Sequence, residues 1–464
     1  EHEFGRHALD WNVTSSGVNR LEPDRVDHVR ARFRDGGAFV LPEEDPQGLR
    51  KTFGRLNESN WVLGTNYRLR LGNEASPVVL KFGAQGRATD RDAVNRQFLL
   101  LARAGALSEA ARSGPIDPLF GDALLAPTAS AWRVGNVAED GEYRATERLY
   151  AGYAMAEWPM TSRIKVIGGA RVEDADIQVT TFLSNGSRFP ARLRNTDVLP
   201  SLVVNVQATE NSAVRLSATQ TLARPEYREL SPVQFLDVVG SAITRGNAEL
   251  RRTLIQNYDA KWEWYPSAGE VLSFGAFYKN FDAPIERIDI ATGGTEQLIS
   301  FFNARSAFNY GVEAEVRKNL GTFAAALSPL TVFGNVTVMQ SEIRIGEGES
   351  ANTNANRPMV GQAPWVVNAG ATWTSTDGRT SATLQYGVVG PRIFSAGTIP
   401  FPDLYEQPRN LVDLSLRIPV GRQVALRLDG RNLLDAPFRL DQGGFTRQEW
   451  RLGRQVSFGL QWRN

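Results

Sequence analysis

An alternating pattern over residues 257–279 constrains the fold of this chain more than any other feature. Its first half places apolar or aromatic residues at every second position, namely Tyr258, Ala260, Trp262 and Trp264 among Asn257, Asp259, Lys261 and Glu263. Its second half repeats the pattern, with Leu272, Phe274, Ala276 and Tyr278 set against Ser273, Gly275 and Lys279. Successive side chains of a strand point to opposite faces, so the segment is predicted to form a hairpin with one apolar and one charged face.

A membrane wall explains such a hairpin, because lipid covers its outer face while its inner face lines a polar lumen. The same alternation recurs along nearly the whole chain. We expect about 17 strands, many of them near the roughly 9–11 residues with which a tilted strand crosses a bilayer. The predicted fold class is an all-β, transmembrane antiparallel β-barrel. Residues expected on its lipid-facing side include Leu9, Trp11, Val13, Val29, Ala31, Phe33, Leu63, Tyr67, Leu149, Ala151, Tyr153, Met155, Val312, Ala314, Val367, Ala369, Leu414, Leu416, Phe458 and Leu460.

The connections between these strands give a second, independent indication. Short turns such as 158–162, 266–270 and 375–379 alternate with long connections at 177–195, 222–253, 282–305, 345–363, 391–408 and 432–449. Outer-membrane barrels have short periplasmic turns and long extracellular loops, whereas a soluble sandwich has no reason to sort its loops by parity. The longest connection, 88–144, is expected to be an extracellular loop with an amphipathic helix over 93–112. Counting back from a periplasmic C-terminus places Glu1 outside, so residues 1–464 are interpreted as a barrel domain that is N-terminally incomplete.

Composition excludes several function classes. Lys and Arg number 52 against 51 Asp and Glu, so no strongly basic surface for nucleic acid is indicated. No apolar run approaches the roughly 18 residues of a membrane-spanning helix. The chain contains no cysteine, which removes thiolate metal sites, thiol nucleophiles and disulfides. No signal peptide is visible at Glu1.

No catalytic or metal-binding pattern stands out, and we predict neither an enzyme nor a bound cofactor or metal. The three histidines, His2, His7 and His28, lie near the N-terminus without a facing Asp or Cys cluster. The chain has no Gly-x-Ser-x-Gly elbow and no phosphate-binding loop. Loop tips at 346–349 and 441–444 carry acidic and glycine residues that suit either calcium or mobile turns, and the sequence does not decide between them. One further set resembles paired carboxylates, but its period-2 spacing places it on one lumenal strand face: Asp259, Lys261, Glu263, Glu313, Glu315 and Arg317.

Aromatic residues divide into two groups. Those at strand ends are predicted to form interfacial girdles rather than a stacking platform for bases or sugars: Trp262, Trp264, Trp365, Trp373, Tyr386 and Trp462. Those in long connections are candidates for ligand contact, although each could instead pack its own loop: Trp132, Tyr143, Phe235, Phe394, Tyr405, Phe438 and Phe445.

Several motifs carry a family resemblance in their order and spacing. Residues 218–232 read Ala-Thr-Gln-Thr-Leu-Ala-Arg-Pro-Glu-Tyr-Arg-Glu-Leu-Ser-Pro, and Gly246-Asn247 and Asn257-Tyr258-Asp259 follow. Further segments are 277–279, 311–315, 361–364, 432–435 and 453–462. From about residue 147 to the end, the chain resembles the C-terminal barrel of TonB-dependent outer-membrane receptors.

The resemblance implies a 22-stranded barrel of the bacterial outer membrane, plugged by an N-terminal domain that is not found here. It implies that the lumenal set of charged residues faces that plug, and that Phe458, Leu460 and Trp462 form a barrel-assembly signal. The final residue, Asn464, departs from the aromatic residue usual in the family.

The expected function is TonB-dependent uptake of a scarce solute, either an iron chelate, an oligosaccharide or a peptide. The expected partners are outer-membrane lipid, the plug, a TonB-type energy-transducing protein and the small solute, with no nucleic acid. Two alternatives remain open, which are a structural barrel within a cell-surface assembly and a passive diffusion pore.

Overall fold

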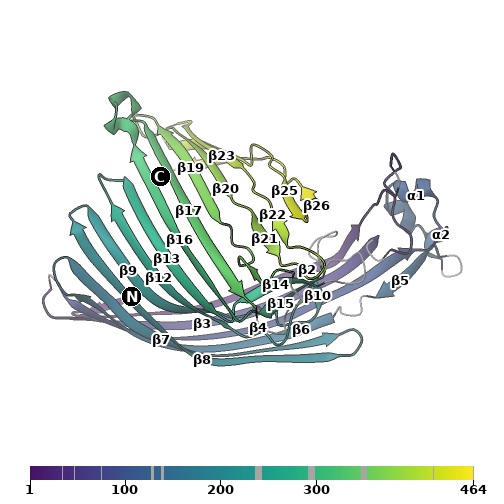
Figure 1. Ribbon diagram of the computed structural model, residues 1–464, viewed down its shortest axis with the longest axis horizontal. Coiled ribbons are helices and arrows are strands. Elements are labelled where there is room, and N and C mark those ends of the chain that lie inside the picture. The colour runs from purple at the N-terminus through teal and green to yellow at the C-terminus, as the bar shows by residue number, and fades with distance from the viewer. Residues whose placement is uncertain are drawn as a thin grey trace.

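The dominant feature of the computed structural model is one large antiparallel sheet curved into an open trough (Figure 1). Among the described residues, this sheet holds 19 strands. The structure describes residues 1–462 except 34, 46–47, 75, 127–129, 137–140, 236–242, 291–297, 346–352 and 422.

Three strands of the sheet are short, namely β1 (His2–Phe4), β5 (Trp132–Asn136) and β18 (Asn356–Arg357), and the other sixteen form the wall. Each wall strand pairs with the next one along the chain. The wall strands are β2 (His7–His28), β3 (Leu49–Leu71), β4 (Val78–Ala102), β6 (Gly141–Pro159), β7 (Ile164–Leu183), β8 (Arg188–Thr209), β9 (Ser212–Ala223), β12 (Thr253–Trp264), β13 (Val271–Asp282), β16 (Ser306–Asn319), β17 (Leu330–Arg344), β19 (Trp365–Thr374), β20 (Ser381–Val389), β23 (Leu411–Pro419), β24 (Val424–Arg431) and β27 (Gln455–Trp462). Within the described residues β27 pairs only with β24, and the sheet is not closed.

The register confirms the predicted apolar outer face over most of the wall. Trp262 lies opposite Phe274 with their rings stacked at 6.0 Å, and Phe274 lies opposite Ala314 on the next strand. Side chains directly opposite in an antiparallel pair share a face, so these pairs build one continuous apolar surface. No second protein layer covers it in the described part, since Phe274 and Leu384 are each 52% exposed. This surface has the character expected of a lipid-facing wall.

The predicted outward face of β6 is wrong. Leu149 lies opposite Arg87 of β4 and Met155 lies opposite Lys81, so both share the polar, concave face of the wall. Tyr150 and Trp158 point outward instead and are 64% and 52% exposed. Both faces of this strand carry large side chains, so the partner strands decide which face turns inward.

The strands β2 to β8 extend well beyond the apolar band. On the outer face of β7, apolar residues end at Val172, and Asp174 and Asp176 follow. Asp176 forms an ion pair with Arg192 of β8 at 2.7 Å. The predicted long connection at 177–195 is therefore wrong, because the two strands continue as a hairpin that turns at 184–187. The charged side chains on the outer face of this hairpin suit contact with water rather than lipid.

Two further predictions fail in the same region. Residues 93–102 do not form a helix, because they continue β4 and pair with an equally long extension of β3; helix α1 begins only at Glu109. Cross-strand hydrogen bonding overrides the local helical spacing of the apolar residues. Val29, Ala31 and Phe33 do not form a strand either. In this stretch the structure shows one isolated bridge, between Ala31 and Val40.

The long connections fold into small elements of their own. None of the described helices has the length and apolar content to cross a membrane. The helical turns are α1 (Glu109–Ser113), η1 (Asp117–Phe120), α2 (Asp122–Leu125), η2 (Leu320–Thr322) and η3 (Ala325–Leu327). The small strands are β10 (Gln234–Phe235), β11 (Ile243–Arg245), β14 (Ile285–Ile290), β15 (Leu298–Asn303), β21 (Arg392–Ser395), β22 (Leu404–Glu406), β25 (Phe438–Gln442) and β26 (Phe445–Trp450). They form two four-stranded sheets, joined by a bridge between Ile288 and Ala396, on the concave side of the wall (Figure 1).

An arginine introduced on the outer face of the wall should destabilise the barrel more than one introduced on the inner face. Replacing Val312, which is 59% exposed among apolar partners, by arginine places a cation in the hydrocarbon layer. We expect Val312→Arg to destabilise the barrel in lipid vesicles by about 2–4 kcal/mol, measured by denaturant unfolding. The matched control is Thr337→Arg, because Thr337 lies on the inner face opposite Glu313 and should tolerate the cation. Equal losses for the two variants would contradict the assignment of the faces.

Candidate functional site

Residues 224–235, here called the inner segment, leave the end of β9 and fold against the concave face of the wall. β9 ends at Ala223, and Pro225, which has no backbone N–H, cannot continue the strand pairing. Tyr227 and Leu230 are buried, and they belong to one hydrophobic cluster with the wall residues listed here: Ala93, Tyr143, Ala145, Ile177, Val179 and Ala191. The inner segment is therefore held by the extended strands β4 to β8 above the apolar band.

Tyr227 anchors the inner segment through polar contacts. Its hydroxyl donates a hydrogen bond of 2.5 Å to Oε2 of Glu147, a buried wall carboxylate that also pairs with Arg87. The Arg91 guanidinium lies 4.9 Å from the centre of the Tyr227 ring and pairs with Glu58 at 2.5 Å. Burial, followed by the nearby Glu147 carboxylate, raises the pKa of Tyr227 well above its ordinary value. The phenol therefore stays protonated and acts as a donor.

A second set of contacts fixes the two ends of this connection. Arg224 pairs with Glu173 at 3.0 Å and lies 3.8 Å from Asp197, which also pairs with Arg252 at 2.5 Å. Asp197 is 3% exposed, so both cations compensate a buried charge. Wall carboxylates thus hold the segment where it leaves β9 and where it rejoins the wall before β12.

The two sequence motifs of this connection contact each other. The backbone N–H of Gly246 donates to the Ser231 carbonyl at 3.1 Å, and that of Asn247 donates to the Glu229 carbonyl at 2.6 Å. A side chain at Gly246 would place its Cβ within 2.6 Å of the carbonyl oxygens of Ser231, Arg228 and Glu229. Only glycine allows this close approach of two backbone segments.

Two polar cavities lie beside the inner segment and share Arg91 and Glu226; together they are called the chamber. One has a volume of about 460 Å³ and is lined by Arg87, Arg91, Glu147, Ile177, Leu222, Arg224, Glu226 and Tyr227, among others. The other has about 170 Å³ and is lined by residues that include Arg20, Glu22, Leu56, Asn95, Tyr143, Glu226 and Phe235. Most of these arginines pair with carboxylates, so the chamber offers both donors and acceptors to a polar ligand.

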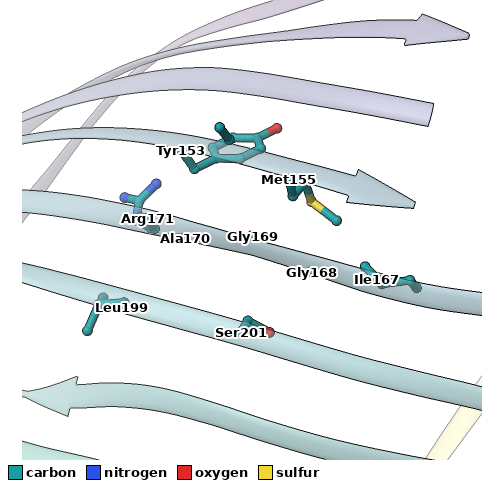
Figure 2. A pocket seen from close by; sticks show the side chains of 10 residues that line it. Tyr153, Met155, Ile167, Gly168, Gly169, Ala170, Arg171, Leu199 and Ser201 are labelled. Carbon is teal, nitrogen blue, oxygen red and sulfur yellow. The ribbon is translucent and has the colours of Figure 1, made fainter. Parts of the chain in front are cut away.

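A third hollow lies elsewhere on β6, β7 and β8 and is mostly apolar. It has about 170 Å³, and Figure 2 shows Tyr153 and Met155 beside Gly168 and Gly169, with Leu199 and Ser201 on the adjacent strand. A Cβ at Gly169 would lie within 2.5 Å of the Ala154 oxygen and of Met155 Cβ. The paired glycines therefore create this hollow, which suits an apolar side chain rather than a charged ligand.

Comparison with known proteins identifies the wall. The family model "TonB dependent receptor-like, beta-barrel" matches residues 5–433. The chain belongs to this family. Its membership confirms the resemblance carried by the motifs, and the wall is that of a transmembrane receptor barrel. No curated protein sequence matches the chain.

Several solved structures of bacterial receptors share the fold. The ferric-catecholate import receptor Fiu from K12 E. coli, in its closed form, matches with a TM-score of 0.66 and 12% identity, over 99% of this chain and 62% of its own. The siderophore receptor PiuA from Acinetobacter baumannii matches with a TM-score of 0.63 and 11% identity, over 98% of this chain and 62% of its own. The ferric yersiniabactin uptake receptor FyuA from Yersinia pestis matches with a TM-score of 0.60 and 15% identity, over 98% of this chain and 58% of its own. This chain thus spans less than two thirds of the length of these receptors, and identities this low show a shared fold alone.

In the receptor barrel, the predicted ligand aromatics do not converge on one site. Tyr143 and Phe235 do meet, with ring centres 6.3 Å apart, and both line the chamber. Trp132 instead stacks on Phe120 at 5.6 Å and donates to the Leu119 carbonyl, so it packs against η1.

The remaining four aromatics lie on the second small sheet. Phe394 lies under the Arg287 guanidinium at 4.8 Å, and Tyr405 lies on the paired strand β22. Phe438 stacks on Trp450 at 4.1 Å, and Phe445 is 76% exposed. A contact between ligand and any of these four stays a prediction.

The predicted lumenal charges share the polar face of the receptor barrel. Glu263 pairs with Arg215 at 2.7 Å, and Lys261 lies 3.5 Å from Glu263 and 4.0 Å from Glu315. The register puts the rest of the predicted set on the same face: Asp259, Glu313 and Arg317. Their role toward a plug stays a prediction.

The other predicted features of the receptor barrel remain untested as functions. The outer-face residues Phe458, Leu460 and Trp462 lie on the edge strand β27, 77%, 78% and 67% exposed, and their role in assembly stays a prediction. Of the proposed loop tips, 346–349 lies outside the described residues. At the other, Asp441 pairs with Arg439 at 3.1 Å, and no group of three or more potential metal ligands occurs in the described part of the chain.

Sequence reasoning missed the polar anchors of the chamber. Glu147 shares the inner face with Leu149, so the expectation that Leu149 faces lipid turns Glu147 to the wrong side. Tyr227 stood in the family motif without an assigned role. Two sequence signals point to these anchors. Tyr227 follows Pro225 by two positions, and Arg87 alternates with apolar neighbours.

The anchor contact predicts a local loss of stability. Tyr227→Phe removes the hydroxyl that donates to buried Glu147, and a hydrogen bond to a charged group contributes about 1.5–3 kcal/mol. We expect faster amide exchange over residues 224–235 while the exchange of β12 and β13 is unchanged. The control is Tyr150→Phe, because Tyr150 lies on the outer face and is 64% exposed. Similar exchange in both variants would show that Tyr227 does not anchor the segment.

The raised pKa of Tyr227 sets the sign of a pH effect. The folded state holds the phenol proton more tightly than the unfolded state, in which a tyrosine titrates near about pH 10. Its contribution to stability is therefore complete below about pH 10 and decreases as the pH rises above that value. Wild type should lose more stability than Tyr227→Phe between pH 8 and 11, measured by denaturant unfolding at each pH. Parallel curves would contradict this.

Proposed function

We propose that this receptor barrel takes up a ferric chelate across the bacterial outer membrane. The observation that carries the proposal is the chamber, a polar space between the wall and the inner segment, at the end of the wall where the long connections fold. The connection that folds back against the wall lets a ligand be contacted from two sides, which favours capture over passive diffusion.

The chemistry of the chamber supports a polar, multidentate ligand. Arg87, Arg91 and Arg224 present guanidinium donors, and Glu226 adds an acceptor. Tyr143 and Phe235 add aromatic surface on the other side of Arg91. Chelators of iron combine oxygen acceptors with apolar or aromatic surface, and such a mixed lining suits them.

The structural neighbours favour an iron chelate over an oligosaccharide or a peptide. Fiu is named as a ferric-catecholate import receptor, PiuA as a siderophore receptor and FyuA as a ferric yersiniabactin uptake receptor. Their shared fold with this chain makes a ferric chelate the first ligand class to test. The proposed partners are outer-membrane lipid at the apolar face, a plug domain in the lumen and a TonB-type energy-transducing protein.

Uptake tests the proposal directly. Cells that express the protein should accumulate radioactive iron from a panel of catecholate, citrate and hydroxamate chelates, and collapse of the proton-motive force should stop accumulation without stopping surface binding. Accumulation that persists without the gradient would favour a passive pore. Binding of no chelate would remove iron from the proposal.

The chamber also predicts which aromatic residue affects affinity. Phe235→Ala removes ring surface that faces Tyr143, and loss of one aromatic contact of about 0.5–1.5 kcal/mol weakens binding roughly two- to tenfold. The matched control is Phe323→Ala, which alters an exposed phenylalanine at the short-turn end of the wall, 75% exposed. Equilibrium binding of the chelate to detergent-folded protein measures both. Equal affinities in the two variants would place the ligand elsewhere.

A further inference from the structure

The short-turn end of the wall contains another polar cavity, apart from the two that form the chamber. It has a volume of about 150 Å³ and lies where the connection from β19 to β20 comes close to Gly421 and Gln423, between β23 and β24. Its lining includes Asp377, Arg379, Arg417, Gln423, Ala425 and Gln461. Arg417 lies on the inner face of β23, opposite Ser381 and Arg427, so the cavity belongs to the polar side of the wall and not to the lipid side.

The arginine pair next to this cavity is unbalanced. Arg417 and Arg427 lie directly opposite each other on β23 and β24, and like charges in that position repel. Arg427 is compensated by Asp429 through two hydrogen bonds of 3.1 and 2.8 Å, and Ser415 donates to the same carboxylate at 2.6 Å. The Arg417 side chain forms no hydrogen bond or ion pair with any residue that the structure describes, and its Nε is buried without a partner.

The other groups around the cavity leave this cation uncompensated. Asp377 already accepts hydrogen bonds from Ser375 at 2.5 Å and from the Arg379 backbone N–H at 3.0 Å. Arg379 donates to the Gly421 carbonyl, which ties the two turns together. The amides of Gln423 and Gln461 form no side-chain hydrogen bond within the described part of the chain, so their N–H groups remain free to donate.

We propose that this cavity binds a small oxyanion, a carboxylate or a phosphate group, through Arg417, Gln423 and Gln461. Guanidinium groups bind oxyanions with two parallel hydrogen bonds, and a partly buried cation without a partner gains most from such a ligand. A volume of about 150 Å³ suits a single acidic group rather than a whole chelate. The oxyanion arrives from the concave or short-turn side, either as free phosphate or as a carboxylate on a polypeptide.

Calorimetric titration of the detergent-folded protein tests this site with two probes, sodium phosphate and N-acetylglycine. We expect saturable binding of at least one probe, and the tighter one identifies the source of the oxyanion. Arg417→Gln should weaken that binding at least tenfold. The control Arg215→Gln removes another inner-face arginine, already paired with Glu263, and should change binding less than twofold. Heat-modifiable electrophoretic migration checks that both variants are folded.

A third variant separates a binding role from a structural one. Asp429→Asn frees Arg427 beside Arg417 and increases the positive charge near the cavity, so it should bind the probe at least as tightly as wild type. The proposal is overturned if neither probe binds, if Arg417→Gln and Arg215→Gln weaken binding equally, or if Asp429→Asn binds more weakly than wild type.

Discussion

Hydrocarbon offers no water to the backbone, so every N–H and C=O group that crosses a membrane must find its partner within the protein. A wall of antiparallel strands meets this requirement, and it leaves the side chains to satisfy two different solvents. The pairs Trp262–Phe274 and Leu384–Leu414 face lipid, while Glu263 and Lys261 on the same sheet face the interior. Any segment that folds on the concave side must therefore offer hydrogen bonds and charges to a polar wall, and not an apolar stripe alone.

The inner segment meets that condition. Tyr227 gives its hydroxyl to Glu147, and Arg224 reaches Glu173. The other long connections use the same strategy, since buried Arg357 pairs with Glu286 at 2.9 Å and both side chains are 2% exposed. Burial raises the pKa of Glu286 above its ordinary value, so the desolvation of this carboxyl offsets part of what the ion pair contributes to stability. Five connections contact one another in this way, through the two small sheets, the bridge between Ile288 and Ala396 and the Arg357–Glu286 pair.

Strand alternation was sufficient to predict the wall wherever one face is plainly apolar, as at Trp262, Phe274 and Val312. It failed at β6, where Leu149 and Tyr150 are both bulky, because pairing with Arg87 of β4 decides the orientation. It also failed over 93–102, where pairing with β3 outweighs a helical spacing. Residues far apart in sequence determine both outcomes. The chamber was predictable only in part for the same reason: Tyr143 and Phe235 were identified as loop aromatics, whereas the contact of Tyr227 with Glu147 joins positions 80 residues apart.

The arginines beside Tyr227 differ in charge balance from Arg417 at the short-turn end of the wall. In the chamber, Arg87 and Arg224 already pair with carboxylates, so a ligand exchanges one set of hydrogen bonds for another and gains little from net charge. At Arg87 and Arg224 a ligand therefore competes with Glu147 and Glu173 for the same guanidinium groups. At the short-turn end Arg417 has no carboxylate partner among the described residues, and an oxyanion bound there neutralises a charge that the wall leaves open. The inner face of one sheet thus holds two kinds of cation, Arg87 and Arg224 with carboxylate partners and Arg417 without one in the described part of the chain, and only the second kind leaves its full charge to a ligand.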